Sequence, residues 1–61
     1  MNIRKITDDM DDEDRNVAHA MNAREYYKAG NEKMARNEVA SDMGFMGTYE
    51  EWVIWLEGVD A

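Results

Sequence analysis

Residues 48–59, with the sequence TYEEWVIWLEGV, contain both tryptophans of the chain and decide its fold. When the stretch is placed on a helix, its large apolar side chains recur every three or four residues and form one stripe. Ile54 lies opposite that stripe and Val53 flanks it, so the helix is apolar around almost its whole circumference. Such a helix belongs in the interior of a protein or of an assembly. The stripe consists of Tyr49, Trp52, Trp55, Leu56 and Val59.

The start of this helix is encoded just before the stripe. Thr48 is a favourable N-cap, and Glu51 three residues later completes a capping box. Glu50 and Glu51 lie in the first turn, where the helix dipole favours negative charge. Gly58 marks the predicted end, so we expect a short aromatic helix over residues 49–57.

The chain has few residues with which to bury this apolar helix. Its 61 residues make a single small domain, 1–61. A chain of this size buries only about 60% of the surface that it exposes when unfolded. It has no cysteine and one histidine, so neither disulfides nor a conventional zinc site can stabilise it. Association with a second copy is the remaining common way to enlarge such a core. We therefore expect a homodimer that covers both indoles.

Upstream of the aromatic helix, the sequence predicts a helical hairpin. Residues 12–29 contain no glycine or proline and form the first predicted helix. Gly30 then suits the C′ position, and Asn31 suits the N-cap of a second helix over residues 32–43. Residues 1–10 are expected to be an irregular lead-in. The predicted fold is all-α: a helical hairpin plus a short C-terminal aromatic helix, completed by homodimerisation.

The first predicted helix has one apolar face for its own protomer and another for a different helix. Arg24 lies in the middle of one face, where we expect it to snorkel or to pair with an acid of the last helix. In the second helix, Ala35, Val39 and Met43 make a narrow stripe with small residues that suits close approach. The residues that we expect in the core or at the interface are Tyr49, Trp52, Trp55, Leu56, Val59, Val17, Met21 and Tyr27.

Charge is concentrated at the two ends of the chain. The net charge is −7, with −4 in residues 1–14, +1 in residues 15–43 and −4 in residues 44–61. This balance disfavours direct binding to nucleic acid, because Lys and Arg supply the affinity for phosphates. No apolar run approaches the roughly 18 residues of a membrane span, and no secretory h-region follows Arg4 and Lys5. We therefore expect a cytoplasmic protein that does not contact membranes.

Six acids stand within residues 8–14, DDMDDED. A calcium loop needs alternating oxygen ligands and a glycine at its sixth position, which this run lacks. We favour a helix start, with Asp11 or Asp12 as the N-cap and acids in the first turn. The alternative is an acidic patch that binds a partner protein. Its residues would be Asp8, Asp9, Asp11, Asp12, Glu13 and Asp14.

No arrangement of residues in the sequence indicates catalysis. Glycine-rich phosphate loops, nucleophile elbows and metal-ligand spacings are absent from it. His19 has no nucleophile marked beside it, and packing or exposure is the commoner role for such a residue. We therefore expect a protein that is not an enzyme, with no catalytic residues, no metal site and no cofactor.

The spacing of Ala23, Tyr26, Gly30, Ala35 and Val39 resembles that of a tetratricopeptide-repeat hairpin. In that family the glycine allows the turn, and the small residues let two antiparallel helices come close. The resemblance covers about half of this chain, and the positions of the family's usual Trp and Leu are polar here. Repeat proteins need about three units for stability, so the resemblance implies hairpin geometry and not membership.

The DDMDDED run and the YEEWVIWLEG stretch, in a chain without cysteine or proline, resemble small acidic helical proteins from the early accessory regions of tailed, lambdoid-type phages. The resemblance implies a protein that binds and redirects a host factor in the host cytoplasm, without catalysis. Anti-CRISPR proteins and other DNA mimics are similar at this level. The alternative function is therefore an acidic DNA mimic that occupies the nucleic-acid-binding surface of a host protein.

Overall fold

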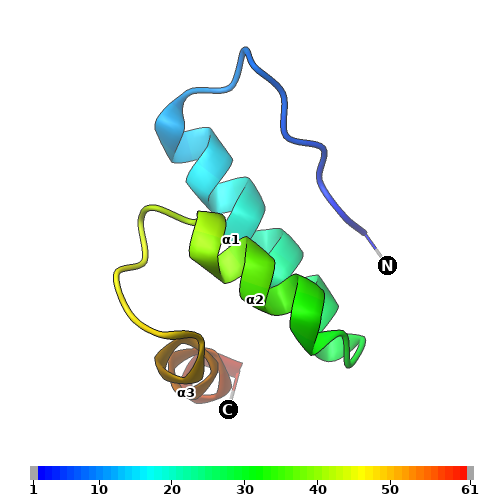
Figure 1. The fold of residues 1–61 in the computed structure, drawn as a ribbon, viewed down its shortest axis with the longest axis vertical. Helices are drawn as coiled ribbons and strands as arrows, with labels where there is room; N and C mark the ends of the chain where they lie inside the picture. The colour runs from blue at the N-terminus through cyan, green and yellow to red at the C-terminus, as the bar shows by residue number, and fades with distance from the viewer. Residues whose placement is uncertain (1, 61) are drawn as a thin grey trace.

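Residues 2–60 contain three helices, two as a hairpin and one across it (Figure 1). The computed structural model describes residues 2–60, and in these it contains no strand. The helices are α1 (Asp12–Lys28), α2 (Glu32–Ser41) and α3 (Tyr49–Asp60). In Figure 1, α1 and α2 lie side by side and antiparallel, while α3 is seen end-on. The prediction of an all-α fold is confirmed, and none of these helices is both long enough and apolar enough to cross a membrane.

The turn between α1 and α2 is a Schellman motif. The N–H of Asn31 donates to the carbonyl of Tyr26 at 2.9 Å, and the N–H of Gly30 donates to that of Tyr27 at 3.1 Å. Gly30 has φ = +78°, a left-handed conformation that favours glycine. The Asn31 side chain then accepts from the N–H of Met34 at 3.2 Å and caps α2. The sequence Gly-Asn therefore reverses the chain in two residues.

The core lies where the small residues of the hairpin meet the aromatic helix. Ala23 of α1 and Val39 of α2 pack with Trp52 and Leu56 of α3, and all four side chains are buried. Ala35 is also fully buried, because small side chains on both helices let α1 and α2 approach closely. All three helices therefore contribute side chains to the core.

The second helix ends two residues earlier than residues 32–43 predict. Asp42 leaves the helical conformation, and its carboxylate accepts from the N–H of Gly44 at 2.9 Å. The amide oxygen of Asn16 on α1 accepts from the N–H of Met43 at 3.1 Å. Met43 therefore lies outside the helix and is 73% exposed, so its predicted place on the Ala35 stripe is wrong.

The third helix continues beyond the predicted stop at Gly58. It runs from Tyr49 to Asp60, because Gly58 keeps a helical conformation and does not adopt positive φ. A glycine inside a helix costs only about 1 kcal/mol relative to alanine, which a packed helix tolerates. The helix therefore extends three residues beyond the predicted range of 49–57.

Candidate functional site

The two tryptophans of α3 lie in different environments. Trp52 is 3% exposed, with its ring edge-on to Tyr27 at 6.0 Å and stacked on Tyr49 at 5.8 Å between centroids. These geometries are favourable for aromatic pairs. Trp55 is 56% exposed. The expectation that both indoles need a second copy is therefore wrong for Trp52, which the single chain covers by itself.

The eight residues expected in the core or at the interface divide into three groups. Trp52 and Leu56 are buried, and Tyr27 and Tyr49 are half-buried against them. The other four side chains are exposed in the single chain. They are Val17, Met21, Trp55 and Val59, with exposed fractions of 49%, 43%, 56% and 60%.

Three of the exposed side chains meet in one groove between α1 and α3. Met21 of α1 and Trp55 and Val59 of α3 line a cavity of about 170 Å³, whose floor includes Leu56. Arg24 lies at the same groove, on the α1 side. We call Met21, Trp55 and Val59 the Trp55 face. Large apolar side chains that stay exposed together beside a charged residue make this groove a candidate binding surface.

Polar contacts hold the opposite side of α3 against the hairpin. The Tyr27 hydroxyl donates to a Glu57 carboxylate oxygen at 2.7 Å, and this hydrogen bond raises the pKa of the tyrosine. Arg36 of α2 donates to Glu50 at 2.6 Å, which lowers the pKa of that carboxyl. The same guanidinium lies 4.5 Å from the centre of the Tyr49 ring. Two acids of α3 therefore position the helix.

The acidic run at residues 8–14 begins α1. Of the two predicted candidates, Asp11 is the N-cap, and its side chain accepts from the N–H of Asp14 at 2.8 Å. The Thr7 hydroxyl donates to Asp9, which lowers the pKa of that carboxyl. All six acids of the run are exposed. Part of the run therefore has a structural role, and all of its charge faces water.

His19 joins the two helices of the hairpin. Its Nδ1 lies 2.6 Å from a carboxylate oxygen of Glu38 on α2, and both side chains are half-buried. A cavity of about 460 Å³ beside His19 also contains Ser41, but that hydroxyl donates to the Asn37 carbonyl at 3.0 Å. No cluster of three metal-ligating side chains occurs among residues 2–60. The His19–Glu38 pair therefore links helices, and the sequence did not predict it.

Asn22 is a second residue whose role the sequence does not reveal. It is 1% exposed, and its amide exchanges two hydrogen bonds with the backbone of Arg4, eighteen residues earlier. This pairing attaches the N-terminal segment to α1. Asn22 follows Ala18 by four residues, and this spacing places both on the same face of α1, which is buried. The spacing does not indicate that Asn22 bonds to Arg4.

Comparisons of this chain with family models, with curated proteins and with solved structures find no match.

Proposed function

We propose that this chain is a non-enzymatic protein–protein interaction module that docks through the Trp55 face, with a second copy of the chain as the occupant of that face. The observation that carries the proposal is the position of Trp55. The fold buries Trp52 and Leu56 from the same helix and leaves Trp55 more than half exposed beside Met21 and Val59. Tryptophan is strongly enriched among the residues that dominate binding energy at protein interfaces.

The site fits docking better than chemistry. The groove has a volume of about 170 Å³, whereas small-molecule sites typically enclose about 300 Å³ or more. Its lining is mainly apolar, with Arg24 as the charged member. A neighbouring protein surface can supply the apolar cover that a small solute cannot. We further propose that the assembled module modulates a host factor in the manner of a small phage early protein, in the host cytoplasm.

The proposal is tested by sedimentation of the wild type, of Trp55→Ser and of Ile54→Ser at micromolar concentrations. Ile54 is the matched control, because it is the adjacent residue of α3, is 72% exposed and lies outside the groove. The wild type and Ile54→Ser should sediment as dimers, and Trp55→Ser should sediment as a monomer. A monomeric wild type would contradict the homodimer, and an equal loss of dimer in both variants would contradict docking through the Trp55 face.

A second candidate function rests on the acidic run. Six exposed carboxylates within residues 8–14 give one end of α1 a dense negative charge, as a mimic of nucleic-acid phosphates requires. Binding to a basic host protein should then weaken steeply between low and moderate salt. Binding that is insensitive to salt and to neutralisation of the run would remove this candidate.

A further inference from the structure

A second groove lies on the side of α3 that carries Ile54. It has a volume of about 320 Å³ and runs between α3 and the hairpin. Its apolar lining, which we call the Ile54 groove, consists of Tyr27 of α1 and Tyr49, Val53 and Ile54 of α3. Ile54 is 72% exposed there. This groove and the one beside Trp55 share no lining residue, so α3 presents two separate apolar surfaces.

The Ile54 groove continues toward the turn of the hairpin. An adjoining hollow of about 180 Å³ includes Gly30 of that turn, and its other lining residues also line the groove. These shared residues are Tyr27, Glu32 and Tyr49. An elongated apolar surface of this kind suits a helix of another protein, because amphipathic helices bind by laying their apolar side into such grooves.

Carboxylates surround the groove, and its one basic residue does not balance them. Glu32 and Glu50 both accept from the guanidinium of Arg36, at 3.1 and 2.6 Å, so one cation faces two acids. Glu57 accepts from the Tyr27 hydroxyl at 2.7 Å, and this donor is neutral. With Arg36 counted, the three acids leave a formal charge of −2 around the groove.

Acidic and apolar residues follow one another along α3 at helical spacing. Val53 and Ile54 lie three and four residues after Glu50, and Glu57 lies seven residues after it. Residues three and four apart are neighbours on a helix surface, and seven residues span about 10 Å. The apolar centre of the groove is therefore flanked by one acid about a turn away on each side.

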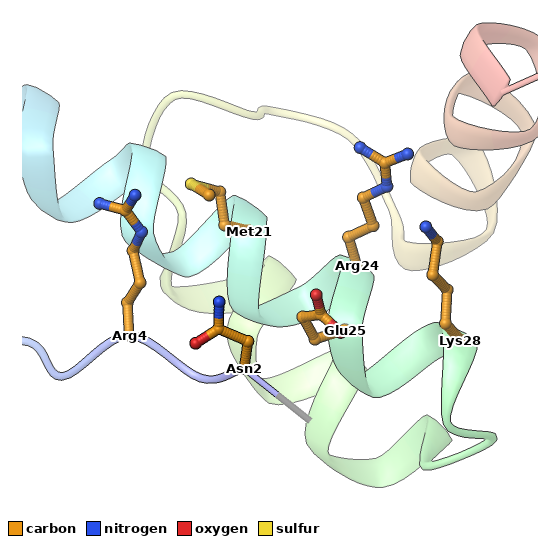
Figure 2. A pocket seen from close by; sticks show the side chains of 6 residues that line it. All are labelled: Asn2, Arg4, Met21, Arg24, Glu25 and Lys28. Carbon is orange, nitrogen blue, oxygen red and sulfur yellow. The ribbon is translucent and has the colours of Figure 1, made fainter.

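The cavity beside the N-terminal segment lacks this arrangement. It has a volume of about 270 Å³, and Met21 is the one apolar residue of its lining. Figure 2 shows the charged ends of Arg4 and Lys28 spread apart from each other. Its polar groups therefore do not converge on one ligand, whereas the Ile54 groove combines an apolar centre with charge of one sign.

We infer that the Ile54 groove binds an amphipathic helix of another protein, in which an apolar residue is flanked about one turn away on each side by a lysine or arginine. The apolar residue packs against Val53 and Ile54, and burial of these side chains supplies affinity. The two basic residues face Glu50 and Glu57, and this opposite charge selects the partner and its register. The inference goes beyond the function proposed above, because it gives the chain a second surface that does not use Trp55.

The probe is an alanine-based peptide of about 18 residues, long enough to form a helix by itself. It carries one leucine, with a lysine one turn before it and another one turn after it. Titration into the ¹⁵N-labelled full chain at low ionic strength should give saturable amide shifts at Tyr27 and along residues 49–57. A peptide with glutamate in place of both lysines, and one with alanine in place of leucine, should each bind at least about tenfold more weakly.

Two substitutions in the groove test its apolar and charged parts. Ile54→Ser should raise the dissociation constant of the lysine peptide about tenfold, because it removes apolar contact area. Glu57→Gln should raise it about threefold, because it removes a charge and keeps an acceptor for the Tyr27 hydroxyl. Glu13→Gln is the matched control, since Glu13 is an exposed acid of α1 outside the groove. It should leave the constant unchanged, and so should Trp55→Ser.

Three results would overturn the inference: no saturable binding of the lysine peptide, equal binding of the glutamate peptide, or an equal effect of Trp55→Ser and Ile54→Ser. Occupation of the groove by a second copy would also overturn it, and would appear as dissociation of the wild-type dimer by the peptide together with a monomeric Ile54→Ser. A monomeric wild type contradicts only the homodimer, because the groove lies within one chain.

Discussion

Asn22 illustrates how one polar residue organises a segment far away in the sequence. A buried amide is costly unless it is hydrogen-bonded. The Asn22 amide meets this requirement because it accepts from the backbone N–H of Arg4 and donates to the backbone carbonyl of the same residue. Among residues 2–60, no buried side-chain nitrogen or oxygen lacks a partner. The same two bonds fix the position of the N-terminal segment on α1.

Replacing Asn22 by alanine should release the N-terminal segment. The substitution removes both bonds to Arg4 and leaves a small void, for an expected loss of about 2 kcal/mol of unfolding free energy. Urea denaturation measures the loss, and amide hydrogen exchange of residues 2–7 measures the release. Arg4→Gln is the control and should change neither by much. Unchanged exchange in Asn22→Ala would contradict the role given to this residue.

The two tryptophans should differ sharply in their contribution to the stability of the monomer. Trp52→Ala should lower the unfolding free energy by about 3–5 kcal/mol, because the indole is buried between two tyrosines. Trp55→Ala should change it by about 0.5 kcal/mol or less in dilute solution, because the side chain is exposed there. Thermal or urea unfolding at low protein concentration checks both values. Similar losses would show that the single chain also depends on Trp55 for its fold.

At the scale of the elements, local rules account for the helix starts better than for the helix ends. Thr48 and Glu51 form the predicted capping box, with reciprocal bonds of 3.1 and 3.0 Å. Such starts depend on residues three apart and are visible in the sequence. The end of α2 depends on Asn16 of α1, which bonds the Met43 N–H from twenty-seven residues away. A contact of that range has no signature in a local pattern.

The capping box predicts a pH dependence of stability. The Thr48 N–H donates to the Glu51 carboxylate and lowers its pKa below the ordinary value of 4.5. A lowered pKa in the folded state stabilises the fold above the unfolded value, and this stabilisation is lost as the pH falls through the folded value. Unfolding free energy should therefore decline below about pH 4.5. The decline should be shallower in Glu51→Gln, and an identical acid limb would contradict the assignment.

The glycines of the turn and of α3 should respond to alanine with opposite signs. Gly58→Ala should stabilise the chain by about 0.5–1 kcal/mol, because the site is helical and an added Cβ meets nothing within 4 Å. Gly30→Ala should destabilise it by about 1 kcal/mol, because φ is +78° there. Unfolding midpoints of the two variants provide the comparison. A loss of stability in Gly58→Ala would indicate that α3 ends before this residue.

At the scale of the whole molecule, the sequence predicts the fold class and the buried stripe of α3, but not which indole stays exposed. Both tryptophans belong to one helical stripe, and the position of the α1–α2 hairpin relative to α3 separates buried Trp52 from exposed Trp55. The attachment of the N-terminal segment has the same origin. Arg4 and Asn22 are eighteen residues apart and meet through two hydrogen bonds that no local pattern predicts. Long-range packing therefore creates both features.

Docking through the Trp55 face is tested most directly by acrylamide quenching of Trp55 in the Trp52→Phe protein, where it is the sole indole. The quenching constant should be high in dilute solution, where the groove of Met21 and Val59 is open, and should fall as the protein concentration rises through the micromolar range. Ile54→Ser in the same background should follow the same curve. A quenching constant that stays high and does not change with concentration would contradict the proposed docking of a second copy.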